Sequence, residues 1–416
     1  MHPITIRYPF RPLRRSLATG AVADLFGLGA EEIPHIVADG CVLDIRAGDL
    51  VLFTGPSGSG KSSLLRAAGR DVGAVDAMYL ELPDVPLVDS LPGAVEERMK
   101  LLAACGLSEA RLLLRTPAQL SEGERYRFRL AFALATLGPR ASGPRGFRVQ
   151  DARGPRGWLM ADEFAANLDR TLAKVLAFNL RRLVTRTRIG VLLATTHDDL
   201  TADLRPDVHV RCHGDGDIRL LCDERTSAAR PISFANEFTR EEGTLADWSR
   251  FARWHYRSHK LCFVKRVVLL RHGPDPIGIC VFTAPAAALA VRTRYFGIAA
   301  PRSRLALQAL NEQLWLLSRV VLHPTYRGAG IASGFVRWAC QTSPVPWIET
   351  LTAMGHANPV FERAGFVRAG VVRKPRDGKG YGGQFGPTGR CDGETRRKSR
   401  WSEPVYYVFD NRRDRG

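Results

Sequence analysis

The residues best suited to chemistry begin with a glycine-rich segment, residues 53–63, whose sequence is FTGPSGSGKSS. Residues 55–62 fit the pattern G-x-x-x-x-G-K-[ST], in which glycines let several backbone N–H groups point at phosphate oxygens. The Lys61 ammonium would reach the β- and γ-phosphates, and the Ser62 hydroxyl would ligate Mg²⁺. The segment therefore predicts a binding site for a nucleoside triphosphate and its Mg²⁺.

A second group of polar residues follows two apolar runs further along the chain. The run at 158–161, WLMA, ends in Asp162 and Glu163, and the run at 190–196, GVLLATT, ends at His197. Asp162 would hold the Mg²⁺ shell, and Glu163 would polarise the attacking water. His197 would contact the γ-phosphate. Together with the glycine-rich segment, these residues predict hydrolysis of the bound triphosphate.

Alternating strands and helices must position these side chains. Residues 38–49 read as a strand and a glycine-containing turn, and residues 49–53 as the buried strand that enters the glycine-rich segment. Ser121 can N-cap a helix that continues to residue 134, with Glu124 as its capping-box partner. Buried strands that alternate with helices are typical of an α/β P-loop fold.

In the order of these motifs, residues 21–225 resemble the nucleotide-binding domain of the ABC ATPase superfamily. The matching segments are the Walker A loop at 55–62, the signature motif LSEGE at 120–124, the Walker B strand at 159–163, the D-loop at 167–169 and the switch histidine His197. The resemblance implies that two such domains enclose two ATP molecules, with Ser121 and Gly123 facing the γ-phosphate held by the partner domain. Because the chain carries one set of motifs, a homodimer is implied.

The resemblance also assigns the site residue by residue. It places Glu163 and His197 in catalysis, and Ser62 and Asp162 at the Mg²⁺. The residues that it assigns to ATP are Gly55, Ser57, Gly58, Ser59, Gly60, Lys61, Ser62, Ser63, Ser121, Gly123 and Asp169. Separately, the upstream Phe26 is either a platform for the adenine base or a core phenylalanine.

Three features depart from the transporter members of this family. Glu124 stands where transporters commonly carry glutamine, as it does in the chromosome-maintenance and repair ATPases of the superfamily. No glutamine occurs between residues 62 and 119 to serve as the Q-loop, for which Asp84 is a candidate replacement. The helical insert at 88–117 is also short. These departures favour an ATPase outside the transporter class.

A second strand–loop–helix arrangement lies in the C-terminal half. The expected elements are a helix at 242–258, a hairpin formed by 262–271 and 276–283, strands at 314–322 and 347–352 and a helix at 333–340. Between a strand and a helix lies HPTYRGAGIA, residues 323–332. A glycine-containing turn that meets a helix N-terminus suits a pyrophosphate.

Residues 233–410 resemble the GNAT family of N-acyltransferases. Residues 327–332 match its acyl-CoA pyrophosphate loop, residues 358–366 its second motif and residues 405–409 its closing strand. The resemblance implies acyl transfer from acetyl-CoA, or another acyl-CoA, to an amine, with a backbone N–H at or next to Val321 polarising the thioester. The residues that it assigns to CoA are Val321, Arg327, Gly328, Ala329, Gly330, Ile331, Ala332 and Asn358.

One residue of the second motif departs from this family in a way that affects the chemistry. Phe361 stands where many members carry the tyrosine that protonates the leaving thiolate, and phenylalanine has no proton to give. Glu349 or Glu312 could act as the base, and Tyr381 as a substitute acid. Binding of acyl-CoA is therefore the firmer expectation, and the acyl acceptor is not identified.

The composition indicates which partners the protein could bind and in which compartment it is expected. The net charge of +18 favours a polyanion such as nucleic acid, bound through the N-terminal tail and basic loops, or else reflects arginine spread over the surface. No apolar run approaches the about 20 residues of a membrane-spanning helix. The eight cysteines include no C-x-x-C pair, as expected of a cytoplasmic protein. The cluster of His209, Cys212, His213 and Cys222 is better explained by a hairpin turn than by zinc.

The expected organisation is a basic, proline-rich tail at 1–20, an ABC-type ATPase domain at 21–225, a linker at 226–236 and a GNAT-like domain at 237–416, with a basic, glycine-rich insertion at about 374–402. The expected function is an ATP-hydrolysing homodimer coupled to an acyl-CoA-dependent N-acyltransferase. The alternative is an ATP-dependent nucleic-acid-binding protein whose GNAT-like half only binds. A transporter's energy subunit would need a separate membrane partner.

Overall fold

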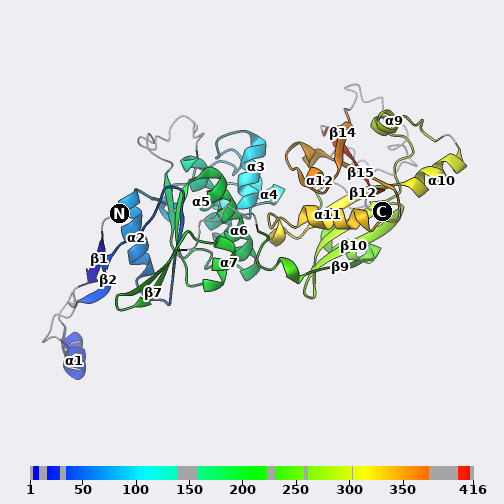
Figure 1. Ribbon diagram of the computed structural model, residues 1–416. Coiled ribbons are helices and arrows are strands. Elements are labelled where there is room, and N and C mark those ends of the chain that lie inside the picture. The colour runs from blue at the N-terminus through cyan, green and yellow to red at the C-terminus, as the bar shows by residue number, and fades with distance from the viewer. Residues whose placement is uncertain are drawn as a thin grey trace. The chain divides into compact units, whose positions relative to one another are not determined.

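In the computed structural model, the described residues are 3–8, 16–28, 34–138, 157–222, 230–256, 261–301, 303–373 and 402–412. They belong to two compact units, Met1–Arg230 and Pro231–Gly416 (Figure 1). Two features named above, the insertion at 374–402 and Tyr381 within it, lie wholly or largely outside the described residues, and so do most residues of the basic segment 138–157.

The first unit is built on a six-stranded sheet with the strand order β4-β5-β6-β3-β7-β8. Its strands are β3 (Leu50–Thr54), β4 (Val75–Asp76), β5 (Trp158–Ala161), β6 (Gly190–Ala194), β7 (Val208–Gly214) and β8 (Asp217–Leu221). Neighbours pair in parallel except β7 and β8, which form an antiparallel hairpin. Every residue of β3 is buried, as expected for a central parallel strand covered on both faces.

Helices cover both faces of this sheet. They are α2 (Lys61–Val72), α3 (Val95–Ala104), α4 (Ala110–Leu113), α5 (Glu122–Leu137), α6 (Arg170–Thr187) and α7 (Thr201–Leu204). Leu50 and Leu52 of β3 share a core with residues of α5 and α6, whereas Val51 and Phe53 share one with residues of α2. This alternation follows the two-residue period of a strand. The layering confirms the predicted α/β arrangement and brings the carboxyl ends of β3, β5 and β6 to one edge of the sheet.

The N-terminal residues differ from the basic tail expected from their proline and arginine content. β1 (Ile4–Tyr8) pairs antiparallel with β2 (His35–Cys41) in a two-stranded sheet, and α1 (Leu17–Phe26) lies between them in the chain. Ile4 is buried in the core on the α2 side of the large sheet. The apolar residues that alternate in β1 account for the difference, because they can be buried in spite of the flanking prolines.

The second unit is built on a seven-stranded sheet with the order β14-β15-β13-β12-β11-β10-β9. Its strands are β9 (Phe238–Glu242), β10 (Val264–His272), β11 (Asp275–Thr283), β12 (Leu314–Leu322), β13 (Trp347–Thr352), β14 (Val367–Val371) and β15 (Val405–Asp410). Neighbours pair antiparallel except β12 and β13, which are parallel. The hairpin and the strands predicted at 314–322, 347–352 and 405–409 are confirmed.

The helices of the second unit are short. They are α8 (Trp248–Ala252), α9 (Ala290–Phe296), α10 (Arg304–Gln313), α11 (Ala332–Gln341) and α12 (Val360–Arg363). α9 and α10 lie between β11 and β12 in the chain, and α11 connects β12 to β13. α11 confirms the helix predicted after the second glycine loop.

The amphipathic helix predicted at 242–258 is wrong. Glu242 is the last residue of β9, and a capping box between Thr244 and Asp247 begins a new helical segment. α8 then spans 5 residues and buries Trp248 and Phe251 in a core shared with β10, β11 and β12. Strand pairing with β10 includes Glu242, and the helical segment ends at Ala252, so the aromatic spacing reflects a short buried helix.

Candidate functional site

The glycine-rich segment between β3 and α2 forms a tight backbone cradle. Gly55, Gly58 and Gly60 have φ angles of +141°, +81° and +90°, which other residues rarely adopt. A Cβ atom on Gly55 would stand 1.9 Å from the carbonyl oxygen of Cys212, and one on Gly60 would stand 2.2 Å from Val37 Cγ1. Side chains at these two positions would therefore collide with their neighbours.

Two side chains of this cradle fit a bound phosphate. The Lys61 Nζ turns back onto the cradle and donates a hydrogen bond to the Pro56 carbonyl oxygen at 2.6 Å. Ser59 Oγ is buried and has no hydrogen-bond partner among the described residues. A cation held over the loop and an unpartnered hydroxyl can both bond to phosphate oxygens. The residues present therefore fit a nucleoside triphosphate.

Oxygen ligands meet beside the cradle. Ser62, in the first turn of α2, donates a hydrogen bond from Oγ to Asp162 Oδ1 at 3.0 Å, and Asp162 follows β5. The other carboxylate oxygen, Oδ2, lies 3.5 Å from Arg66 Nη2. A hydroxyl and a carboxylate at this spacing are ligands that Mg²⁺ prefers. Ser62 and Asp162 thus fit a magnesium ion.

Glu163 is exposed at the end of β5, with a φ angle of +50°. The next side chain, Phe164, is fully buried, and its backbone N–H donates to the Ala194 carbonyl oxygen at 2.7 Å. The Glu163 N–H donates to Asp162 Oδ1 at 3.0 Å. Burial of Phe164 therefore turns the Glu163 carboxylate outward while its backbone stays beside Asp162.

His197 follows β6 at the same edge of the sheet, and its N–H donates to Thr195 Oγ1 at 3.2 Å. Burial, and then the positive charge of Arg170, lower the pKa of the His197 imidazole. Arg170 is itself paired with Asp199. The lowered pKa keeps His197 neutral at neutral pH, so that one ring nitrogen can donate a hydrogen bond and the other can accept one.

The predicted capping box at the start of α5 is confirmed. Ser121 Oγ accepts a hydrogen bond from the Glu124 N–H at 3.4 Å, and Glu124 Oε2 accepts one from the Ser121 N–H at 2.9 Å. Glutamate and glutamine can both make this second bond, so Glu124 keeps the cap. A Cβ on Gly123 would contact Leu168 at 3.6 Å, which places the start of α5 against the segment that follows Glu163.

The structure therefore separates the predicted residues of the first unit into two groups. Hydrogen bonds join Ser62, Asp162 and Glu163. The start of α5 instead contacts residues 167 and 168 of the same chain. Asp169 N-caps α6, because its Oδ1 accepts the Leu172 N–H at 2.9 Å.

An aromatic residue that sequence reasoning missed lies beside the cradle. The Tyr8 hydroxyl in β1 is 2.9 Å from Ser63 Oγ, and the Tyr8 side chain is half exposed. Phe26, the predicted candidate for an adenine platform, ends α1 and is 74% exposed. The sequence signal that could have identified Tyr8 was an aromatic residue at the end of an alternating apolar segment, residues 4–8. The neighbouring prolines made this segment look like an irregular tail instead of a strand.

The cluster around His209 forms the predicted hairpin. β7 and β8 pair across the turn, and the His209 Nε2 hydrogen-bonds with Thr54 Oγ1 at 2.8 Å. Cys212 is buried in the core on the α2 side of the sheet. Among the described residues, no group of three or more His, Cys, Asp or Glu side chains could hold a metal ion.

The second glycine loop connects β12 to α11. Gly328 and Gly330 have φ angles of +96° and +80°, so both need the left-handed region. The Arg327 Nε donates to the Leu322 carbonyl oxygen at 3.1 Å, and the Ala329 N–H donates to the Tyr326 carbonyl oxygen at 3.2 Å. The loop therefore begins as a compact turn and leaves Gly330 next to the N-terminus of α11.

The strands around this loop diverge. β12 and β13 pair only between residues 314–316 and 347–349, whereas the rest of β12 pairs with β11 alone. β13 continues along β15 instead. Val321 is buried and opposite Ile279 of β11, and Asn358 is exposed just before α12.

A hydrogen-bonded chain supports the start of the second loop. The Tyr326 hydroxyl is 2.8 Å from His272 Nδ1, and His272 Nε2 is 2.8 Å from Glu237 Oε2. The ring of Phe234 stacks on His272 at 5.2 Å between centroids. Residues 234 and 237, at the beginning of the second unit, are thus tied to the residue that precedes Arg327.

The two candidates for the base in the second unit, Glu349 and Glu312, have different surroundings. Glu349 is buried, with its two carboxylate oxygens 2.9 and 2.7 Å from Arg292 nitrogens, and Tyr406 donates to it at 2.9 Å. Glu349 therefore forms a structural ion pair with Arg292 and is not available as a catalytic base. Glu312 is exposed on α10, where it accepts a hydrogen bond from Gln308.

Phe361, which replaces the expected tyrosine, is a buried core residue. Its ring lies 5.7 Å from the ring of Tyr407, measured between centroids. The Tyr407 hydroxyl donates to Glu362 Oε1 at 2.5 Å. Burial, and then the Glu362 carboxylate, raise the pKa of Tyr407 to about 12. A protonated phenol therefore lies next to the position where the family's acid is missing.

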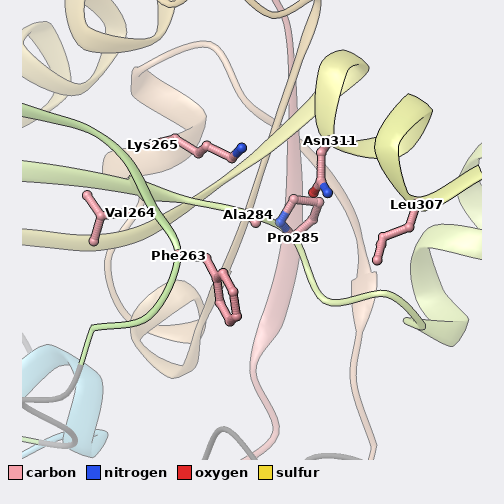
Figure 2. A pocket seen from close by; sticks show the side chains of 7 residues that line it. All are labelled: Phe263, Val264, Lys265, Ala284, Pro285, Leu307 and Asn311. Carbon is pink, nitrogen blue, oxygen red and sulfur yellow. The ribbon is translucent and has the colours of Figure 1, made fainter. Parts of the chain in front are cut away.

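A pocket of about 310 Å³ opens in the second unit (Figure 2). Its lining residues are Phe263, Val264, Lys265, Ala284, Pro285, Leu307 and Asn311. They come from the start of β10 and the residue before it, the two residues after β11, and α10. Thr283 pairs with Leu316, near the beginning of β12, whereas the second glycine loop follows the end of that strand. The pocket and the loop therefore lie toward opposite ends of β12.

Two curated relatives carry names that bear on the first unit. The chain is 30% identical over 244 residues to the lipoprotein-releasing system ATP-binding protein LolD of Novosphingobium aromaticivorans, a match that covers 49% of this chain and 94% of that protein. It is 33% identical over 186 residues to the aliphatic sulfonates import ATP-binding protein SsuB 2 of Mesorhizobium japonicum, covering 40% of this chain and 66% of that protein. No family model matches the chain.

Solved structures also match. A dimeric ATP-binding cassette in a post-hydrolysis state, bound to ADP and Pi, is 18% identical with a TM-score of 0.35, and the match covers 53% of this chain and 97% of that one. Within the part of the chain that the structure describes, no helix has the length and apolar character needed to cross a bilayer.

Proposed function

The chain belongs to the ABC ATPase family through the unit that carries the glycine cradle, and on that premise we propose how its residues bind and hydrolyse ATP. The backbone of residues 55–63 holds the phosphates, with Ser59 as a further hydrogen-bond donor. Lys61 exchanges its bond to the Pro56 carbonyl oxygen for one to a phosphate oxygen. Tyr8 offers its ring to the adenine base, since its hydroxyl already lies beside Ser63.

Hydrolysis in this proposal depends on the carboxylates after β5. Ser62 and Asp162 would hold Mg²⁺, which when bound neutralises charge on the phosphates. The Glu163 carboxylate accepts a proton from water as the water oxygen bonds to the γ-phosphorus, and the bond from that phosphorus to ADP breaks. Neutral His197 donates a hydrogen bond to a γ-phosphate oxygen. Glu163 is suited to this role because it is exposed beside Asp162.

The single observation that carries the proposal is the 3.0 Å contact between Ser62 Oγ and Asp162 Oδ1. The test is ATPase activity of Glu163→Gln, which should lose roughly a hundredfold or more in turnover while still binding ATP, because it lacks the base. Glu96→Gln, an exposed glutamate on α3, is the matched control. Normal turnover in Glu163→Gln would remove Glu163 from the mechanism.

We propose that the active form is a homodimer. One set of motifs is present, and Ser121 and Gly123 lie at the start of α5 rather than hydrogen-bonded to the cradle of their own chain. Sedimentation of the Glu163→Gln variant should show a dimer with ATP and a monomer without it. A monomer under both conditions would argue against the arrangement.

The named relatives support a second candidate role, as the ATP-binding subunit of a membrane transporter. The names of LolD and SsuB 2 place those proteins in lipoprotein release and sulfonate import. This observation weighs against the preference for a non-transporter ATPase drawn from Glu124 and the absent Q-loop glutamine. Recovery of the tagged chain with a polytopic membrane protein after detergent extraction would support the transporter role, and its purification without one would favour the other.

For the second unit we propose acyl-CoA binding and N-acyl transfer. Three features support it, namely the sheet order, the divergence of β12 from β13 after residue 316 and the loop that enters α11 through Gly328 and Gly330. In the reaction, the acceptor nitrogen bonds to the thioester carbonyl carbon, the carbon–sulfur bond breaks, and the proton lost by the amine balances the one gained by the CoA thiolate. The Tyr407 phenol, whose ring lies 5.7 Å from the ring of Phe361 between centroids, is a candidate for the acid.

Calorimetric titration with acetyl-CoA tests this proposal. Arg327→Ala should weaken binding by about tenfold or more, because a charge-assisted contact to a pyrophosphate is lost. Arg294→Ala, an exposed arginine on α9, should bind like the wild type. No heat of binding in the wild-type protein would contradict the proposal. The nucleic-acid alternative stays a prediction, to be checked by salt-dependent binding of DNA and RNA.

A further inference from the structure

Tyr126 connects the start of α5 to the segment that carries Glu163. Its hydroxyl oxygen accepts a hydrogen bond from the Ala165 N–H at 3.2 Å, across 39 positions of the chain. Tyr126 lies two residues after Glu124 in the first turns of α5. No other role described above involves this side chain.

The segment that Tyr126 contacts has an uncommon backbone. Glu163 and Ala165 have φ angles of +50° and +60°, in the left-handed region that a residue with a Cβ atom rarely adopts. Such conformations persist only where surrounding contacts hold them. Here the N–H groups of residues 164–166 make three hydrogen bonds: Phe164 donates to β6, Ala166 donates to the Glu163 carbonyl oxygen at 3.1 Å, and Ala165 donates to Tyr126. The Ala165 carbonyl oxygen also accepts the Leu168 N–H at 3.2 Å.

These three contacts have different effects. The bond from Phe164 fixes the buried side of the turn, and the bond from Ala166 closes the turn on itself. Only the bond to Tyr126 ties it to a side chain of another element. Without that bond, the Ala165 N–H loses its side-chain acceptor, and the turn that carries the Glu163 carboxylate is held less firmly.

The phenol is suited to this task because it stays neutral. Burial raises the pKa of Tyr126, the bond from Ala165 opposes that rise, and the negative charges of Asp162 and Glu163 add to it. The hydroxyl therefore remains protonated at neutral pH and brings no additional negative charge next to the two carboxylates. Its oxygen keeps a lone pair for Ala165.

We propose that Tyr126 is a positioning residue for ATP hydrolysis: by accepting the Ala165 N–H, it holds the turn that aims Glu163. This inference rests on the proposed role of Glu163 as the base. It also links the start of α5 to the base, because a Cβ on Gly123 would lie 3.6 Å from Leu168, only a few residues beyond the same turn.

The test is Tyr126→Phe in the full chain, a change that keeps the ring and removes the hydroxyl. The kcat for ATP hydrolysis should fall by about tenfold, as expected when a base loses its orientation. The affinity for ATP and the melting temperature should stay near wild type, since the cradle and the aromatic packing are retained. Amide hydrogen exchange at Ala165 should become faster. Tyr79→Phe, at an exposed tyrosine, is the matched control for all four measurements.

Two outcomes would overturn the inference. One is an unchanged kcat in Tyr126→Phe. The other is a loss of ATP affinity and melting temperature that accounts for the whole change in rate, which would show a purely structural role. Failure of the proposed base is recognised separately, because Glu163→Gln would then keep its turnover whatever Tyr126→Phe does.

Discussion

The Ser62 hydroxyl lies 3.0 Å from the Asp162 carboxylate, although 100 positions separate the two residues in the chain. Ser62 begins α2 after β3, and Asp162 follows β5, with β6 between these two strands in the sheet. Parallel pairing aligns the carboxyl ends of the strands, and the cradle then turns the chain toward Asp162. A hydroxyl and a carboxylate from distant segments are thus brought together at the place where Mg²⁺ is proposed to bind.

The first prediction concerns this pair. Asp162→Asn should raise the Mg²⁺ concentration needed for half-maximal ATPase activity by about tenfold or more, because an amide is a poorer ligand than a carboxylate for a hard cation. Asp217→Asn, at an exposed aspartate of β8, should leave the Mg²⁺ dependence unchanged. Activity measured over a magnesium titration checks both. Identical curves for the two variants would contradict the assignment.

A second prediction compares two glycines with positive φ angles. Gly55→Ala would place a Cβ 1.9 Å from the Cys212 carbonyl oxygen, whereas Gly40→Ala would meet nothing within 4 Å. Gly40→Ala should lower the free energy of unfolding by about 1 kcal/mol through backbone strain alone. Gly55→Ala should lower it further and abolish ATP binding. Urea unfolding and nucleotide binding distinguish them, and equal effects would mean that the cradle is not tight.

A third prediction follows from the lowered pKa of His197. Below its lowered folded pKa the imidazole becomes charged, so turnover should fall as the pH drops through that value. Arg170→Gln removes the smaller of the two causes and should move this acid limb upward in pH. The unfolded chain binds this proton more tightly, because its histidine has the ordinary pKa of about 6.5. The free energy of unfolding therefore also falls as the pH drops from about 6.5 through the lowered pKa of folded His197. The pH–rate profile and an NMR titration of His197 check the direction. A downward shift in the variant would contradict it.

A fourth prediction separates a buried ion pair from an exposed one in the second unit. Glu349→Gln leaves the Arg292 guanidinium buried without its counter-charge and should lower the free energy of unfolding by about 3–5 kcal/mol. Glu241→Gln breaks a partly exposed pair with Arg271 and should cost at most about 1 kcal/mol. Chemical unfolding followed by tryptophan fluorescence compares them. Similar losses would mean that Glu349 does not depend on its partner.

Much of the candidate site could be predicted from the order of the residues, because its local structure depends on residues that are close together in the chain. The glycine cradle, the capping box of Ser121 and Glu124, and the strand before Asp162 each depend on a few consecutive residues. The helix predicted at 242–258 is shorter at both ends in the structure. Pairing of β9 with β10, a contact across about 30 residues, extends to Glu242, and α8 ends at Ala252.

The role of a carboxylate was the least predictable property. Glu349 and Glu163 both end or interrupt apolar runs, and both were candidates for a base. Only the fold shows that Glu349 meets Arg292 and Tyr406 in the interior while Glu163 stays at the surface. Burial and partner choice are set by segments far away in the chain, so no local pattern reports them.

Residue types and their spacing were enough to predict a triphosphate cradle, the cation ligands and the α/β class, because these predictions use short motifs and the alternation of strands and helices along the chain. The three-dimensional arrangement alone decided which groups are within bonding distance: Ser62 with Asp162, Tyr8 with Ser63, and Tyr126 with Ala165. The physical reason is range. Hydrogen bonds act over about 3 Å, and distant segments come that close only through the packing of the whole unit.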